Sequence, residues 1–82
     1  MILTVKLFGP AARIIGSPEL HIPESGAALT CGTLRLAIAR HYPQLAELIP
    51  SGRIAVNHSY ASDEIVLTGG EEIALIHAVS GG

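Results

Sequence analysis

The chain has 82 residues, about half the length usually given to one domain, and this predicts a single compact unit. A domain this small buries only about 60% of the surface that its unfolded chain exposes, which argues against a stand-alone enzyme active site. Charged residues make up 15% of the chain, against roughly 25% in an ordinary soluble domain. The low charge predicts that another protein, or a second copy of this one, covers part of the surface.

Charge and cysteine usage exclude several classes of partner. The net charge is -2, and the basic residues are scattered rather than clustered, which argues against nucleic acid. Cys31 is the one cysteine, so an intramolecular disulfide and a Cys-rich zinc site are both excluded. No stretch approaches the roughly 20 apolar residues of a membrane span, and Ile2–Phe8 lacks the layout of a signal peptide. We therefore expect a cytoplasmic protein without a membrane partner.

The first quarter of the chain predicts a long-looped hairpin. Residues Ile2–Phe8 alternate between apolar and polar positions, which is the pattern of a half-buried strand. Gly9 and Pro10 stop this strand, and a short helical turn is expected over Ala11–Ile15. Glu19–Ile22 then reads as a second strand that pairs with the first.

One main helix is predicted after a loop of small residues. Thr30 is a suitable N-cap, and Pro43 disfavours helical geometry at the residue before it, so the helix is expected to end near His41. Its apolar stripe has i, i+3, i+4, i+7 spacing and consists of Leu34, Ala37, Ile38 and His41.

The second half of the chain predicts a helical turn and further strands. A helical turn is expected over residues 44–49, a strand over 53–57 and a short irregular strand through Val66. The two glycines at 69 and 70 make a tight turn into a last strand over 71–78. The predicted order is strand, strand, helix, strand, strand.

The predicted sheet has one covered face and one open face. A single helix covers only one face, and we expect it to pack on Leu3, Val5, Leu7, Ile54, Val56, Ile73 and Leu75. The open face is expected to carry Phe8, Ala55, Ala74 and Ile76, which is unusually apolar for a face left to water. The alternatives are a partner on this face, self-association through it, or a weakly apolar sheet exposed without a partner.

The last residues of the sequence form the most informative feature. Val79, Ser80, Gly81 and Gly82 follow directly after the predicted last strand. Two residues without side chains can thread a narrow channel and let the backbone approach a nucleotide closely. Five extended residues reach roughly 17 Å, which suits delivery of a carboxylate into another protein's active site. The alternative is a frayed terminus.

Other candidate residues give weaker signals. The four histidines lie 17 to 20 residues apart, so no two are neighbours on one helix and no metal site is expected. His77 precedes the tail and is expected to meet whatever receives it. Cys31 falls in the first helical turn, where the helix dipole favours a thiolate, but no matching base or second cysteine supports a redox or nucleophilic role.

The whole chain resembles a family of ubiquitin-like sulfur carriers, the MoaD/ThiS family, and within it the small subunit of molybdopterin synthase. The order and spacing of several short segments carry this resemblance. They are Val5–Phe8 with Ala11–Gly16, the helix start at Thr30, Tyr42–Leu45, Ile54–Asn57, and Gly70–Ile76 leading to Val79–Gly82.

The resemblance implies an α+β fold of the β-grasp type, with a mixed four- to five-stranded sheet and one main helix on one face. Residues 1–77 would form this domain and residues 78–82 a flexible Gly-Gly tail. By position, the resemblance implies that Phe8, Tyr60, Ile76 and His77 dock the partner.

The resemblance also implies a mechanism. An ATP-dependent, E1-like activating enzyme converts the Gly82 carboxylate to an acyl adenylate, and sulfur then displaces AMP to give a thiocarboxylate. In the molybdopterin branch the tail enters a channel of the large, catalytic synthase subunit, where Val79, Ser80 and Gly81 would line the channel. The tail then donates sulfur to a cyclic pterin precursor to build the dithiolene. The chain itself binds no permanent cofactor, and ATP belongs to the activating enzyme.

One departure from the family pattern lies just before the tail. The molybdopterin branch commonly has two prolines where this chain has His77 and Ala78, and their loss makes the tail less stiff, since proline fixes its backbone angle. The alternatives left open are a carrier for thiamine, cysteine or tungsten-cofactor synthesis, and a ubiquitin-like modifier or interaction module.

Overall fold

A computed structural model describes residues 2–23 and 29–77 of the chain. Its elements form one five-stranded sheet, one two-stranded ribbon, two α-helices and two short 3-10 helices. In chain order they are β1 (Ile2–Leu7), α1 (Pro10–Ile15), β2 (Glu19–Pro23), β3 (Leu29–Thr30), α2 (Cys31–His41), η1 (Pro43–Leu45), η2 (Ile49–Ser51), β4 (Gly52–Val56), β5 (Ser59–Tyr60), β6 (Val66–Leu67) and β7 (Ile73–His77).

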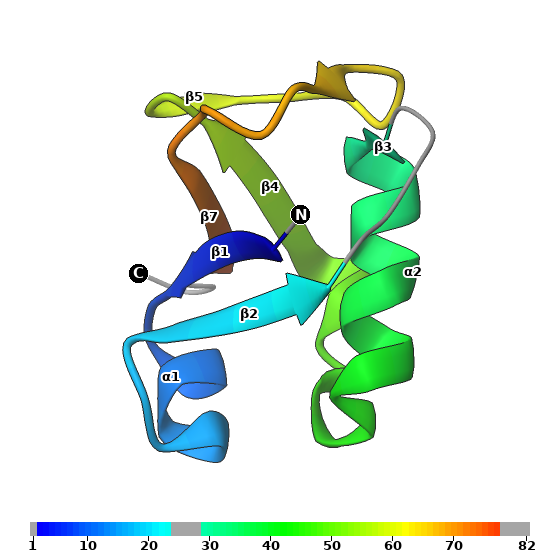
Figure 1. Cartoon of the computed structure of the whole chain (residues 1–82). Coiled ribbons are helices and arrows are strands. Elements are labelled where there is room, and N and C mark those ends of the chain that lie inside the picture. The colour runs from blue at the N-terminus through cyan, green and yellow to red at the C-terminus, as the bar shows by residue number, and fades with distance from the viewer. Residues whose placement is uncertain (1, 24–28, 78–82) are drawn as a thin grey trace.

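The sheet is mixed and has the strand order β2-β1-β7-β4-β5. The outer strands are added as antiparallel hairpins, β2 beside β1 and β5 beside β4, while the central pair β1 and β7 is parallel. Between β2 at one edge and β4 on the far side of β7, the chain passes through α2, which covers one face of the sheet (Figure 1). This is the β-grasp architecture that the family resemblance implies, and the fold prediction is confirmed.

The core lies between α2 and the covered face of the sheet. The inward positions of β1 alternate with exposed ones, and the same alternation holds in β2, so each strand gives one side to the core. Helix α2 contributes Leu34, Ala37 and Ile38, all buried as predicted, whereas His41 is exposed because the stripe ends one turn earlier. The other large aliphatic side chains that are fully buried are Val5, Leu20, Ile22, Leu45, Ile54, Ile73 and Leu75, and Leu3, Leu7, Ile49 and Leu67 are nearly so.

The start of α2 follows the predicted capping chemistry. The Thr30 hydroxyl accepts a hydrogen bond from the Thr33 backbone N–H at 3.1 Å, and the Thr30 backbone N–H donates to the Thr33 hydroxyl at 2.9 Å. This reciprocal pair satisfies two backbone donors that a helix start otherwise leaves without partners. At the other end, Pro43 opens η1 and so stops α2 at His41.

Two parts of the fold differ from the sequence prediction. The segment after Asn57 forms a paired strand, β5, at the sheet edge, and β3 and β6 form a separate ribbon of two residues each. The periodicity of such short strands is too brief to read from sequence. The last strand begins at Ile73 rather than 71, because the carboxylate of Glu71 closes the preceding turn.

Candidate functional site

An apolar hollow lies on the open face of the sheet. Its floor is a row of residues that are register neighbours across four strands: Lys6 on β1, Ala74 on β7, Ala55 on β4 and Tyr60 on β5. The two central residues are alanines, and the outer two have long side chains, so the row dips in the middle. The resulting hollow has a volume of about 430 Å³.

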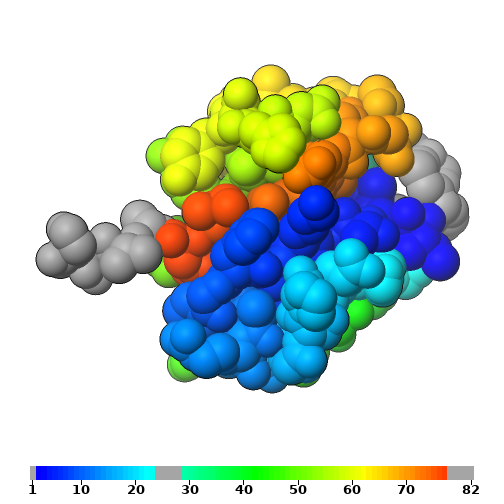
Figure 2. All heavy atoms as spheres, turned by 90° about the vertical axis from the view of Figure 1, so that its left-hand side faces the viewer, coloured from blue at the N-terminus to red at the C-terminus, as the bar shows by residue number. Residues whose placement is uncertain are grey.

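Larger apolar side chains form the walls of the hollow. Phe8, directly after β1, is 51% exposed and Tyr60 is 58% exposed. Ile76, two residues beyond Ala74, points to the same face. Figure 2 looks onto this side of the molecule, where the red atoms of β7 lie between the blue atoms of β1 and the yellow-green atoms of β4 and β5. The hollow thus presents apolar groups to water without a covering element among the described residues.

Polar side chains stand at one rim of the hollow. Lys6 Nζ lies 3.2 Å from Glu72 Oε2, and His58 Nε2 lies 3.5 Å from the same oxygen. All three side chains are substantially exposed, so these pairs add little to stability. They nevertheless give the apolar hollow a polar edge, an arrangement typical of protein docking surfaces.

The turn between β4 and β5 places two of these residues. Asn57 and His58 have φ of 50° and 74°, the left-handed pair that a two-residue hairpin turn requires and for which asparagine is favoured. The Asn57 side-chain oxygen also accepts a hydrogen bond from the Glu72 backbone N–H at 2.9 Å. This bond ties the turn to the segment before β7, and so holds His58 and Glu72 at the same rim.

The structure brings together three of the four residues predicted to dock a partner. Phe8, Tyr60 and Ile76 line the hollow. His77 lies at the end of β7 and its ring contacts the Leu48 carbonyl instead. The predicted tail residues Val79, Ser80, Gly81 and Gly82 lie outside the described residues. Docking and tail roles stay predictions.

Sequence reasoning did not include Lys6, His58 and Glu72 in the site. Lys6 could have been predicted, because the alternation along β1 puts it on the same face of the sheet as Phe8. No sequence signal marks His58 and Glu72, which depend on the hairpin turn and on the Asn57 bond across 15 residues of sequence.

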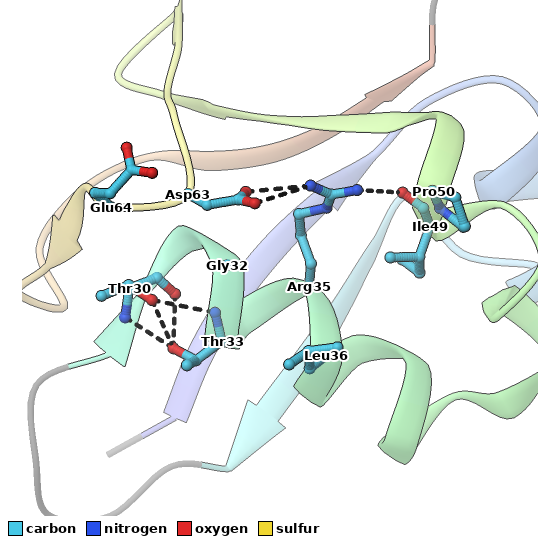
Figure 3. Close-up of a pocket in the computed structure, with 9 residues that line it drawn as sticks. All are labelled: Thr30, Gly32, Thr33, Arg35, Leu36, Ile49, Pro50, Asp63 and Glu64. Carbon is cyan, nitrogen blue, oxygen red and sulfur yellow. Dashed lines mark hydrogen bonds and ion pairs between the residues drawn. The ribbon is translucent and has the colours of Figure 1, made fainter.

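A second, larger depression lies beside α2, between the helix, η2 and the turn at Asp63. It has a volume of about 720 Å³, and Figure 3 shows Arg35 reaching across it. Arg35 Nη1 donates to Asp63 Oδ1 at 3.1 Å and Nη2 donates to the Ile49 carbonyl at 2.9 Å. Two guanidinium nitrogens of Arg35 are therefore bonded within the groove, whereas its Nε is buried without a partner among the described residues.

Cys31, the first residue of α2, lies beneath the turn that carries Asp63. Burial raises the pKa of the Cys31 thiol, and the carboxylates of Asp63 and Glu71 raise it further. Burial and negative neighbours thus outweigh the favourable helix dipole that the sequence indicated. The thiol is a packing group at neutral pH, and the structure gives it no nucleophilic activation.

Two further features bear on function. Within residues 2–23 and 29–77, His, Cys, Asp and Glu side chains form no cluster of three suited to a metal ion. Neither α-helix in the described part of the chain has the length and apolar character needed to cross a membrane.

The sequence model of the ThiS family matches residues 5–82. The chain belongs to the ThiS family. The match includes all four residues of the floor of the hollow and the Gly-Gly residues at 81 and 82. A search of curated proteins finds no match.

Solved structures agree with this assignment. SAMP1 from Haloferax volcanii matches with a TM-score of 0.83 at 24% identity, with 100% of each chain covered. The small archaeal modifier protein 1 (SAMP1) from Methanosarcina acetivorans matches with a TM-score of 0.76 at 26% identity, over 99% of this chain and 96% of that one. A chain in the complex of subunits 1 and 2 of the molybdopterin-converting factor from Helicobacter pylori matches with a TM-score of 0.67 at 28% identity, with 100% of each chain covered.

Together these matches define a ubiquitin-like β-grasp protein of the family that includes sulfur carriers and small modifiers.

Proposed function

We propose that this ThiS-family chain is a sulfur carrier that acts as the small subunit of a molybdopterin synthase. The observation that carries the proposal is the course of β7. This strand contributes Ala74 and Ile76 to the apolar hollow, and Gly81 and Gly82 follow four and five residues after its last residue, His77. A partner seated on the hollow is therefore bound next to the root of the tail.

The proposed chemistry belongs to the tail and to two partners. A Gly82 carboxylate oxygen attacks the α-phosphorus of ATP on an E1-like activating enzyme, and pyrophosphate leaves. Hydrosulfide then attacks the acyl carbon, AMP leaves, and a thiocarboxylate forms. On the large, catalytic subunit the thiocarboxylate sulfur bonds to a carbon of a cyclic pterin, and water cleaves the acyl carbon–sulfur bond, which leaves the sulfur on the pterin and restores the Gly82 carboxylate. We place these steps in the cytoplasm, and the chain needs no cofactor of its own.

The hollow is the proposed docking surface for both partners. Its apolar floor and walls supply contact area, and the rim formed by Lys6, Glu72 and His58 supplies polar contacts that orient the partner. The Helicobacter pylori match supports a second subunit as a partner, because that structure is a complex of subunits 1 and 2.

The decisive experiment is an intact-mass measurement. The chain is incubated with its host's activating enzyme, ATP and a sulfur source, and a chain without Gly82 serves as the control. We expect a mass increase equal to sulfur replacing one oxygen, absent from the control. A chain that stays unmodified, while the enzyme is active on a known carrier, would contradict the proposal. Addition of the large subunit and cyclic pterin then tests the pathway through dithiolene formation.

A second candidate function is protein modification through an isopeptide bond at Gly82. The similarity to SAMP1 from Methanosarcina acetivorans supports it. The sequence offers a sharp discriminator, because Lys6 is the only lysine of the chain. Side-chain linkage between two copies must therefore use Lys6, and a Lys6→Arg variant keeps the charge opposite Glu72 while removing the amine. Conjugates between copies that vanish in this variant indicate a modifier, and a free thiocarboxylate as the stable product, without conjugates, indicates a carrier.

A further inference from the structure

The root of the tail carries an unusual contact. His77 is the last residue of β7, pairs with Gly52 across the sheet, and immediately precedes residue 78. Its ring nitrogen Nε2 lies 2.7 Å from the backbone carbonyl oxygen of Leu48. A carbonyl only accepts hydrogen bonds, so Nε2 carries the hydrogen and donates it.

The two ring nitrogens of His77 differ in their hydrogen bonds. Its other nitrogen, Nδ1, is buried and has no hydrogen-bond partner among the described residues. Burying a polar atom without a partner costs free energy. Among the described residues, the contact between Nε2 and the Leu48 carbonyl is therefore the one hydrogen bond of the ring.

Gly52 makes the space for the ring. A Cβ at this position would lie 3.1 Å from His77 Nε2 and 3.0 Å from the nearest methyl carbon of Leu75. The backbone of Gly52 is extended, with φ of -89°, so no turn requires a glycine there. Space for the neighbouring side chains is the physical reason for glycine at this position.

The Leu48 carbonyl is itself fixed. The Leu48 backbone N–H donates to the Leu45 carbonyl at 2.9 Å, and the Ser51 hydroxyl donates to the Leu48 carbonyl at 3.2 Å. The acceptor thus belongs to the bonded segment from η1 to η2, which packs under α2 through the buried Leu45 and Ile49. His77 joins the end of β7 to this segment.

We propose that His77 is a positioning residue whose bond to Leu48 fixes the direction in which the tail leaves the domain. The inference rests on the proposed function of the tail. Delivery of the Gly82 carboxylate requires a tail whose root points toward the partner, and a fixed root lowers the ordering cost at each encounter. The bond acts next to the hollow without contributing to its lining.

Three variants test this role. His77→Leu keeps an apolar side chain of similar bulk and removes the donor, whereas His77→Gln retains an N–H donor at a similar reach. His41→Leu, an exposed histidine on α2, is the matched control. We expect His77→Leu to lower kcat/KM for thiocarboxylate formation by about 10-fold, mainly through kcat, since a misdirected reactive group costs rate rather than docking. His77→Gln should recover most of the loss, and the control should match the wild type.

Readouts independent of activity separate this inference from the proposed function. In ¹⁵N NMR of the wild-type imidazole, the hydrogen is expected on Nε2, and amide exchange at the end of β7 should be faster in His77→Leu than in His77→Gln. A hydrogen on Nδ1, or equal amide exchange in the two variants, would contradict the proposed role of the His77–Leu48 bond even if the chain carries sulfur. A wild type that is never thiocarboxylated refutes the proposed function, while the NMR result still decides the role of this bond. Should His77→Leu fail to fold, the wild-type tautomer and His77→Gln remain decisive.

Discussion

Two hollows lie on opposite sides of the sheet, and they differ in whether their lining groups are already bonded or are left exposed to water. The groove beside α2 is the larger, at about 720 Å³, but its Arg35 bonds to the Asp63 carboxylate and the Ile49 carbonyl. The hollow on the open face is smaller, at about 430 Å³, and its alanines and aromatic walls have no covering element among the described residues.

The comparison teaches that size is a poor guide to function here. The charged pair of this groove, Arg35 and Asp63, is already bonded, so a ligand that binds either of them would exchange an existing bond for a new one. An apolar hollow in contact with water gains free energy when a partner covers it. The smaller hollow also shares β7 with the root of the tail, whereas the groove lies across the core.

The largest expected effect comes from a charge in the floor of the hollow. Ala74→Glu places a carboxylate at the centre of the proposed interface, where docking would strip it of water while its register neighbour Lys6 is already paired with Glu72. We expect the affinity for the large subunit to fall about 100-fold, which corresponds to about 3 kcal/mol. Titration calorimetry with the purified subunit measures the loss.

A matched variant in the other hollow completes this test. Leu36 lines the groove beside α2 and is 67% exposed, so Leu36→Glu adds the same charge on the opposite side. We expect its affinity to stay within about twofold of the wild type, as for a surface position away from a binding site. Equal losses in the two variants, or a loss only in Leu36→Glu, would reverse the comparison.

The second prediction concerns stability rather than binding. Arg35→Ala removes the bonds to Asp63 and to the Ile49 carbonyl that close the groove, and hydrogen bonds to charged groups contribute about 2 kcal/mol. We therefore expect a loss of about 2 kcal/mol in the free energy of unfolding, measured by urea denaturation, with sulfur loading unchanged. Arg40→Ala, on an exposed position of α2, should cost less than about 0.5 kcal/mol. Similar losses in Arg35→Ala and Arg40→Ala would show that the bonds of Arg35 across the groove do not stabilise the fold.

The two hollows also differ in how far the sequence predicts them. Most of the open-face hollow follows from strand periodicity, because Phe8, Ala74 and Ile76 occupy alternate positions of strands that are readable one at a time. Tyr60, on the two-residue strand β5, was expected there only from the family resemblance. Helix α2 and its Thr30 cap were likewise predicted from local spacing. Local patterns of this kind need no knowledge of the rest of the fold.

The remaining features depend on contacts between distant segments. Arg35 meets Asp63 across 28 residues and His77 meets Leu48 across 29, and neither pairing has a spacing rule. The same holds for Cys31, whose first-turn position indicated a favoured thiolate until burial and the carboxylate of Asp63 reversed the direction of its pKa. Long-range geometry therefore decided the groove, the thiol and the root of the tail.

The third prediction tests the edge of the groove formed by the start of α2. Thr30→Ala removes one half of the reciprocal pair with Thr33, and loss of a threonine N-cap typically costs about 1 kcal/mol. Thr30→Ser keeps the hydroxyl and should retain most of the free energy of unfolding. Neither substitution should change the affinity for a partner, because the cap lies on the groove side. A binding defect in Thr30→Ala at full stability would place a partner on that side.

The smallest expected effect distinguishes two adjacent carboxylates, one bonded internally and one at the rim of the open-face hollow. Glu71 accepts hydrogen bonds from the Thr68 and Gly69 backbone N–H groups and from the Thr68 hydroxyl, and these lower its pKa to about 2. Glu72, by contrast, contacts Lys6 at the rim. Since the pKa of Glu71 is lower in the folded chain than its ordinary value of 4.5, its ionised form stabilises the fold above about pH 4.5. That contribution is lost as the pH falls toward about 2.

A Glu71→Gln variant isolates this contribution. It should be less stable than the wild type at neutral pH, and the difference should shrink as the pH falls from 4.5 toward 2. Denaturant titrations of both proteins across that range measure it, with Glu47→Gln, at an exposed position, as the control for removing one surface charge. A difference independent of pH would mean that the turn before β7 does not depend on the ionised carboxylate. Because β7 carries both the floor of the hollow and the root of the tail, a looser turn in Glu71→Gln should also weaken partner binding slightly, whereas Glu47→Gln should not.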